Sequence, residues 1–129
     1  MLASSDLMAF VSASDMAAAR DFYSDTLGLS LVEENPGACV LDAHGTMLRV
    51  TAVGEVVAAP YTVLGWAVGD IAATVQSLRK RGVVFRDFDG MEQDGLGIWR
   101  APGGDLVAWF SDPVGNTLSV TQFGAAAQD

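Results

Sequence analysis

An internal repeat constrains the fold of this chain more than any other feature of its sequence. The stretch Ala38–Val50, ACVLDAHGTMLRV, aligns with Ala108–Val120, AWFSDPVGNTLSV, and the two share Ala, Asp, Gly, Leu and Val at matching positions. Upstream of each stretch, SDMAA from Ser14 matches GDIAA from Gly69. Self-similarity over this length is typical of a duplicated supersecondary unit. We therefore expect two copies of one motif.

The first copy predicts a strand, a helix and three further strands. Leu7–Ala13 alternates apolar and polar residues, which is typical of a half-buried strand. Asp15 can then accept amide hydrogen bonds as a helix N-cap, and Gly28 supplies the left-handed position that ends the helix. Leu29–Glu33 predicts the next strand. Within Ala38–Val50, the turn Asp-Ala-His-Gly separates the last two strands.

The second copy repeats this order. Tyr61–Val68 predicts a strand and Asp70 an N-cap. After the helix ends at Gly82, Val83–Phe88 predicts the next strand. The turn Asp-Pro-Val-Gly separates the final two strands within Ala108–Val120. Each copy is therefore predicted as a β-α-β-β-β unit.

Length and composition fit one domain, and the two β-α-β-β-β units make its predicted class α+β. The 129 residues suit a single domain, and apolar types make up 50% of them, which is enough to bury a core. We predict one domain over 1–129, with a first unit at 7–53 and a second at 61–122. The net charge of -9 would repel a phosphate backbone, so we expect no nucleic-acid partner. No apolar stretch reaches the roughly 20 residues of a spanning helix and the N-terminus lacks a basic signal region, so we expect a cytoplasmic protein without membrane contact.

The segment 89–104 has no counterpart in the first copy. Its glycines and acidic side chains are typical of a solvated loop, and GIWRAP within it is compatible with a short strand against DLVAWF. Loops of this length in compact domains are also often functional. The second interpretation is therefore a lid over a pocket, carrying Glu92 and Trp99.

Cys39 and His44 are the single cysteine and the single histidine. One cysteine forms no internal disulfide and no cysteine-based zinc site. His44 falls in a predicted hairpin turn, where a solvated or capping role is expected. Strand alternation would point Cys39 and His44 to opposite faces, which argues against a nucleophilic pair.

Two motifs resemble the vicinal oxygen chelate superfamily, also called the glyoxalase/bleomycin resistance protein/dioxygenase superfamily. SDMAAARDFYSDTLGL is similar to the family's Asp-opened helix that ends in Phe-Tyr and then Leu-Gly-Leu, and DPVGNTLSV is similar to its Asp-Pro-x-Gly-Asn turn. The resemblance covers residues 7 to 122. It implies a glyoxalase-like fold, in which two units form a curled mixed sheet around a cleft, and a homodimer. It does not fix the function, because the family includes isomerases, dioxygenases, antibiotic-modifying transferases and drug-sequestering proteins.

The metal enzymes of that family place ligands on the first and last strand of each unit. Counted from the helix-opening and turn Asp residues at the family's spacing, these positions are occupied here by Met8, Arg49, Val63 and Ser119. None of the four is a normal ligand of a divalent metal, and a guanidinium would repel one. We therefore predict no metal site and no cofactor.

The resemblance and strand alternation together assign residues to the cleft. The assigned residues are Met8, Phe10, Ser12, Met47, Arg49, Thr51, Val63, Gly65, Ala67, Thr117, Ser119 and Thr121. Met8 and Phe10 have an equal alternative as extra core filling. Arg49 either binds a ligand carboxylate or enolate oxygen or pairs internally with Glu33, Glu34 or Glu92.

Two classes of function fit this cleft. The first is a metal-free protein that binds a partly apolar or aromatic metabolite or antibiotic, as the drug-sequestering members of the family do. The alternative is a lyase, isomerase or dioxygenase-type enzyme with a non-standard site. We favour binding over catalysis, because the missing ligands remove the Lewis acid and the cleft offers no replacement base. A purely structural or protein-interaction role ranks third.

Overall fold

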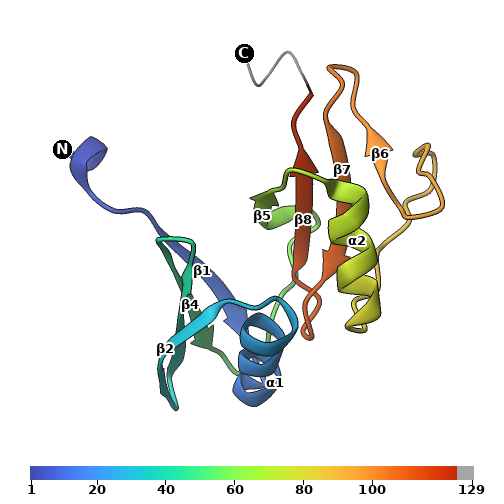
Figure 1. Cartoon of the computed structure of the whole chain (residues 1–129). Coiled ribbons are helices and arrows are strands. Elements are labelled where there is room, and N and C mark those ends of the chain that lie inside the picture. Colours follow the sequence, from blue (N-terminus) through green and yellow to red (C-terminus); the bar gives the residue numbers. More distant parts are fainter. Residues whose placement is uncertain (125–129) are drawn as a thin grey trace. The chain divides into compact units, whose positions relative to one another are not determined.

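Each half of the chain folds into a four-stranded mixed sheet with its own helix, as the repeat predicts. The computed structural model describes residues 1–124. It divides into unit 1, Met1–Ala58, and unit 2, which begins at Ala59 (Figure 1). The boundary lies in the expected linker, and 125–129 of the predicted domain lie outside the described residues. The α+β class and the two repeated units are thus confirmed.

Unit 1 contains the elements predicted from the first copy. They are β1 (Met8–Ala13), α1 (Met16–Arg20), which continues as the π-helical turn η2 (Asp21–Thr26), β2 (Ser30–Asn35), β3 (Ala38–Ala43) and β4 (Thr46–Ala52). A short 3-10 helix, η1 (Leu2–Ser4), precedes them and was not predicted. The strand order is β1-β4-β3-β2. The β1 strand runs parallel to β4, whereas the other neighbours are antiparallel.

Unit 2 repeats this topology. Its elements are β5 (Thr62–Ala67), α2 (Ile71–Lys80), β6 (Trp99–Arg100), β7 (Leu106–Ser111) and β8 (Thr117–Gln122). The strand order is β5-β8-β7-β6, with β5 parallel to β8. No helix within residues 1–124 is long and apolar enough to cross a bilayer.

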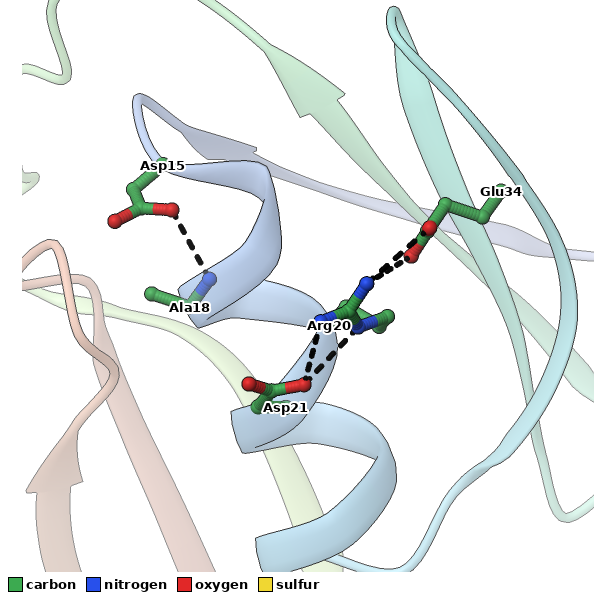
Figure 2. Close-up of polar contacts among 5 residues, drawn as sticks. All are labelled: Asp15, Ala18, Arg20, Asp21 and Glu34. Atoms are coloured by element: carbon green, nitrogen blue, oxygen red, sulfur yellow. Dashed lines mark hydrogen bonds and ion pairs between the residues drawn. The ribbon is translucent and has the colours of Figure 1, made fainter.

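An aspartate caps each helix as predicted. The Asp15 carboxylate accepts a hydrogen bond from the Ala18 amide at 3.0 Å (Figure 2), and Asp70 accepts one from the Ala73 amide at the same distance. These bonds satisfy amides that lack a partner within the helix. Gly82 has a φ of 92°, which places it in the left-handed region after α2. The two helices therefore begin for the same local reason.

The two hairpin turns differ in length, and the difference changes the register. In unit 1 a two-residue turn at His44 and Gly45, both with positive φ, joins β3 to β4. In unit 2 the turn spans 112–116 and is held by the buried Asp112 carboxylate, which accepts the Asn116 amide at 2.9 Å. The longer turn shifts β7 by one residue relative to the sequence alignment.

As a result, the aligned alanines of the repeat are not equivalent in the fold. Ala38 pairs with Thr51, whereas Ala108 pairs with Val120. A shift of one residue in a strand reverses the face of every side chain. The alignment of the repeat is therefore correct for the last strand of each unit and wrong for the strand before it.

The predicted strand at Val83–Phe88 is also wrong. This segment makes a single bridge, from Phe85 to Phe110, and the Arg86 amide donates to the Trp109 carbonyl at 2.8 Å. Beyond that point the Phe88 amide donates to the side chain of Gln93 instead of to a strand. The edge of the sheet is completed by β6, which is the short strand predicted in GIWRAP.

The core of each unit lies on the predicted strand face. The fully buried side chains are apolar: Tyr23, Leu41, Leu48 and Val50 in unit 1, and Ile71, Val75, Phe110 and Leu118 in unit 2. Each such side chain contributes about 1.5–3 kcal/mol relative to an exposed position. The opposite face of each sheet therefore lies outside this core.

Candidate ligand-binding faces

The sheet face of unit 1 that points away from this core carries the residues predicted for the cleft. Register pairs Met8 with Met47, Phe10 with Arg49, and Ser12 with Thr51. Because directly paired residues share a sheet face, the six side chains lie together. We call this set the unit 1 open face. Its large apolar members are exposed: Phe10 at 58%, Met8 at 44% and Met47 at 41%.

Arg49 lies half-buried in the middle of the unit 1 open face. Its guanidinium makes no hydrogen bond or ion pair with the residues of unit 1. Glu33 shares this face through register, but Val40 separates the two residues across the sheet. The Arg49 guanidinium therefore has its donors available on this side of the sheet.

Glu34, one of the internal partners considered for Arg49, is engaged elsewhere. Its carboxylate lies 3.2 Å from Arg20, whose guanidinium also pairs with Asp21 at 3.0 Å (Figure 2). Hydrogen bonds from Arg20 to Asp21 and then to Glu34 raise the pKa of Arg20 above its ordinary value. These contacts join α1 to β2 and leave Glu34 unsuited to neutralise Arg49.

The corresponding face of unit 2 combines small and hydroxyl side chains with an indole. Gly65 pairs with Ser119, which pairs with Trp109, so these three form one row. Thr62 pairs with Thr117 in the next row. The remaining row comprises Ala67, Thr121, Val107 and Trp99. We call this set the unit 2 open face.

A bulge alters one predicted position on this face. The register of β5 shifts between Thr62 and Leu64, so Val63 is the extra residue and Thr62 takes its row. Val63 is 37% exposed. The family position for a metal ligand therefore lies at a local irregularity of the strand.

Aromatic side chains cluster on the unit 2 open face. The Trp109 ring lies 5.4 Å from the Phe88 ring, edge to face, and 5.9 Å from the Trp99 ring. The Trp109 indole also donates to the Thr62 hydroxyl at 3.1 Å. Such aromatic contacts and this bond orient the indole. The sequence pattern predicts Phe88 as part of a strand, but it lies outside the strands of unit 2.

Arg86 supplies a cation that sequence reasoning missed. Its guanidinium donates to the Thr117 hydroxyl at 2.9 Å and lies 5.1 Å from the centre of the Phe88 ring. Thr117 is only 6% exposed and Ser119 only 7%. The signal in the sequence was an arginine between Phe85 and Phe88, but the sheet face of its side chain could be inferred only from a strand that does not form.

The two residues predicted for a lid lie on different sides of unit 2. Trp99 joins the aromatic cluster, whereas Glu92 lines a pocket beside the first turn of α2. The loop between them is held by Gln93, whose amide bonds to Phe88, Arg86 and Gly97 backbone atoms at 2.8 to 3.0 Å. A lid motion stays a prediction.

The side chains at the family's metal positions do not fit a divalent cation. Met8, Arg49, Val63 and Ser119 offer one hydroxyl and a positive charge. Within residues 1–124 no three side chains of the His, Cys, Asp or Glu types form a group able to hold a metal.

Cys39 and His44 do not supply a nucleophile. His44 lies in the hairpin turn as predicted. Cys39 is fully buried, and its burial, together with the charge of Glu34, raises the pKa of the thiol despite the opposing charge of Arg20. A buried thiol with a raised pKa is a poor nucleophile.

Solved structures of other proteins share this fold. A glyoxalase/bleomycin resistance protein/dioxygenase from Alicyclobacillus acidocaldarius is 21% identical, with a TM-score of 0.70 over 96% of this chain and 95% of that chain. A lactoylglutathione lyase from Agrobacterium tumefaciens is 20% identical, with a TM-score of 0.68 over 92% and 93% of the two chains. TnmS3, an antibiotic binding protein from Streptomyces sp. CB03234, is 26% identical, with a TM-score of 0.65 over 95% and 98%.

The family comparison is decisive for membership. No curated protein matches the sequence. The family model described as Glyoxalase/Bleomycin resistance protein/Dioxygenase superfamily matches residues 7–120, which include both units. The chain therefore belongs to the glyoxalase/bleomycin resistance protein/dioxygenase superfamily.

Proposed function

We propose that this protein binds a small, partly apolar or aromatic molecule, a metabolite or an antibiotic, without a metal ion. The observation that carries the proposal is the unit 2 open face, where Trp99, Trp109 and Phe88 adjoin the hydroxyl of Thr117 and the cation of Arg86. Ligand pockets typically combine such aromatic walls with a few placed polar groups. The protein is expected to act as a cytoplasmic homodimer.

The unit 1 open face supports the same proposal. It offers the exposed side chains of Met8, Phe10 and Met47 beside the guanidinium of Arg49. Exposed apolar side chains in one patch are typical of a binding surface. Methionine adapts its shape to irregular ligands. A ligand with an apolar body and an anionic or electron-rich oxygen suits this face.

One relative supports binding as the function. TnmS3 is described as an antibiotic binding protein. The lactoylglutathione lyase is an enzyme of the same fold, and it keeps the alternative of a lyase, isomerase or dioxygenase-type reaction open. That alternative requires a base, and the arginines of the two open faces stay protonated.

Native mass spectrometry of protein purified without an affinity tag tests the proposal. We expect an organic molecule to co-purify, and metal analysis of the same sample to find no stoichiometric zinc, nickel, iron or manganese. About one equivalent of any of these metals would refute the metal-free function and favour an enzyme.

Two matched tryptophan variants localise the binding. Trp109→Phe removes an indole from the unit 2 open face, whereas Trp66→Phe removes one that stacks on Phe110 in the core. The co-purified molecule should be lost or reduced in the first variant and kept in the second. Equal retention in both would show that the aromatic cluster does not hold the ligand.

A further inference from the structure

The insertion 89–104 builds a cavity on the side of unit 2 that the proposed function does not use. The cavity has a volume of about 540 Å³ and lies among the first turn of α2, the loop at 92–94 and the ends of β6, β7 and β8. This volume is in the range of small-molecule pockets, roughly 300–1,000 Å³.

The cavity lies on the helix side of the sheet. Arg100, Leu106 and Gln122 form one row of the ladder and all line the cavity. Leu106 alternates with Val107, which belongs to the unit 2 open face, so the two side chains point to opposite faces. The cavity is therefore distinct from the aromatic cluster around Trp109.

Apolar side chains form the floor of the cavity. Ile71 is 2% exposed and Ile98 is 8% exposed, and Leu106 is half-buried. The Gln122 side chain accepts the Ile71 amide at 2.9 Å, which fixes α2 to β8. The floor can therefore bury an apolar group of a ligand without a change in the fold.

The rim carries three carboxylates and one guanidinium. The carboxylates belong to Asp70, Glu92 and Asp94, and the guanidinium belongs to Arg100. Neither Glu92 nor Arg100 has a hydrogen bond or ion pair within residues 1–124. The rim therefore has an excess of negative charge, and one carboxylate is fully available.

The helix end at this cavity does not attract an anion. The Ile71 amide already bonds to Gln122, and the Ala73 amide bonds to Asp70. The Asp70 charge also offsets the positive end of the helix dipole. A cation is therefore the complementary ligand charge.

Unit 1 offers an internal comparison. Its helix α1 begins with the same capping aspartate, Asp15, but the first copy has no insertion corresponding to 89–104. The apolar floor at Ile98 and the rim charges of Glu92, Asp94 and Arg100 all come from that insertion. The extra segment thus accounts for the cavity.

We propose that this cavity binds a small organic cation, an amine or guanidine that carries an apolar group. The apolar group lies on Ile71, Ile98 and Leu106, and the cationic group faces Glu92. This site is additional to the proposed function and does not depend on it.

The test uses phenethylammonium as the probe and phenylpropionate, which has a similar body and a negative charge, as its control. We expect phenethylammonium to shift the backbone amide NMR signals of Ile71, Ala72 and Ile98 in a saturable way, and added salt to weaken the effect. Phenylpropionate should leave these signals in place. Equal shifts with both compounds would refute the charge assignment.

Three charge variants sharpen the test. Glu92→Gln should weaken the binding of phenethylammonium by about fivefold, the value of one unit charge at close range in water. Arg100→Gln should strengthen it, and Glu55→Gln, which makes the same change as the first variant on an exposed linker residue, should leave it unchanged. Equal effects of Glu92→Gln and Glu55→Gln would overturn the proposal. If Glu92→Gln failed to fold, an unchanged affinity in Arg100→Gln would overturn it instead.

The position of the NMR shifts separates this site from the proposed function. Phenethylammonium shifts confined to the Trp109 indole and Ser119 would place the cation on the unit 2 open face and refute the cavity site. Absence of any shift at Ile71, Ala72 and Ile98 would refute it as well. Loss of the co-purified molecule in Trp109→Phe reports on the unit 2 open face alone, whereas the amide shifts of Ile71, Ala72 and Ile98 report on the cavity, so either proposal can fail without the other.

Discussion

Phe10 in unit 1 and Gly65 in unit 2 occupy the same place in the repeated ladder. Phe10 pairs with Arg49, and Gly65 pairs with Ser119. Unit 1 thus presents a ring that is 58% exposed, whereas unit 2 has no side chain there at all. A Cβ atom at Gly65 would lie 2.8 Å from the Ser119 hydroxyl, so the glycine leaves room for that hydroxyl beside the backbone of β5.

In unit 2 the aromatic residue of this row lies on β7, whereas in unit 1 it lies on β1. Trp109 lies across from Ser119, at the place where unit 1 has Val40 across from Arg49. Unit 2 therefore covers its polar residues with its own indole and with Arg86, while the apolar residues of β1 and β4 in unit 1 remain exposed. The comparison teaches that a duplicated backbone can present ligand-binding groups in two ways: as an aromatic cluster held by internal contacts in unit 2, and as exposed apolar side chains in unit 1.

Removal of the Trp109 indole should have the largest effect on the free energy of unfolding. Trp109→Ala loses the ring contacts to Phe88 and Trp99 and the bond to Thr62, so the free energy of unfolding should fall by about 3 kcal/mol. Phe10→Ala in unit 1 should cost less than about 1 kcal/mol because the ring is exposed. Urea denaturation measures both, and equal losses would contradict the difference between the faces.

A smaller effect is expected at the glycine. Gly65→Ala should lower the free energy of unfolding by about 2 kcal/mol, because the new methyl group overlaps the Ser119 hydroxyl. The second change Ser119→Ala removes that hydroxyl and should restore most of the loss. Gly54→Ala is the matched control, since nothing lies within 4 Å of a Cβ at that position. A neutral Gly65→Ala would argue against the close packing of unit 2.

Arg49 tests whether the unit 1 open face binds an anionic ligand. Arg49→Leu should weaken the binding of an acidic ligand by about 1.5 kcal/mol, because a charged hydrogen bond is lost. The melting temperature should stay the same, since the guanidinium has no partner within unit 1. A lower melting temperature with unchanged affinity, measured by calorimetry, would instead indicate a structural ion pair.

Self-association tests whether a second copy covers the exposed residues. We expect a homodimer, with a sedimentation mass of twice 13.5 kDa at micromolar concentration. Phe10→Asp should weaken the dimer by at least about tenfold, or 1.4 kcal/mol, by placing a charge in an apolar contact. Val84→Asp, at a residue that is 78% exposed in unit 2, is the control. A wild-type mass near 13.5 kDa would remove this prediction.

The smallest effect concerns the buried thiol of unit 1. Burial raises the pKa of Cys39 above the ordinary thiol value of 9.0, so the folded state holds the proton more tightly than the unfolded state does. The contribution of the Cys39 thiol to the free energy of unfolding is fully present below pH 9.0 and is lost as the pH rises through the pKa of the folded state. Cys39→Ala should therefore show a shallower loss of melting temperature at alkaline pH than the wild type. Identical slopes would show that the thiol does not contribute.

Local signals made much of the fold predictable from the sequence. Asp15 and Asp70 cap their helices because an aspartate before an apolar periodic segment satisfies free amides. Alternation placed Phe10 and Arg49 on one face and Leu48 in the core. Helix caps and strand alternation depend only on residues close in the sequence, so the sequence pattern was enough to predict them.

The unit 2 open face could not be predicted in the same way. The face of Trp109 depends on the length of the turn at 112–116, and one extra residue reverses it. Arg86 and Phe88 were assigned to a strand, whereas the side chain of Gln93 takes the backbone bonds that a strand partner would have made. A polar side chain that replaces a strand partner leaves no periodic signal in the sequence.

The three hydrogen bonds made by the Gln93 side chain also have an energetic consequence for ligand binding. All three of its partners, Arg86, Phe88 and Gly97, lie close to it in the sequence, so the segment can reach its final shape before any molecule arrives. Ordering a flexible segment during association costs about 1–2 kcal/mol for each residue that becomes fixed. Because this segment is ordered in advance, the entropic penalty is part of the free energy of folding and does not weaken ligand binding.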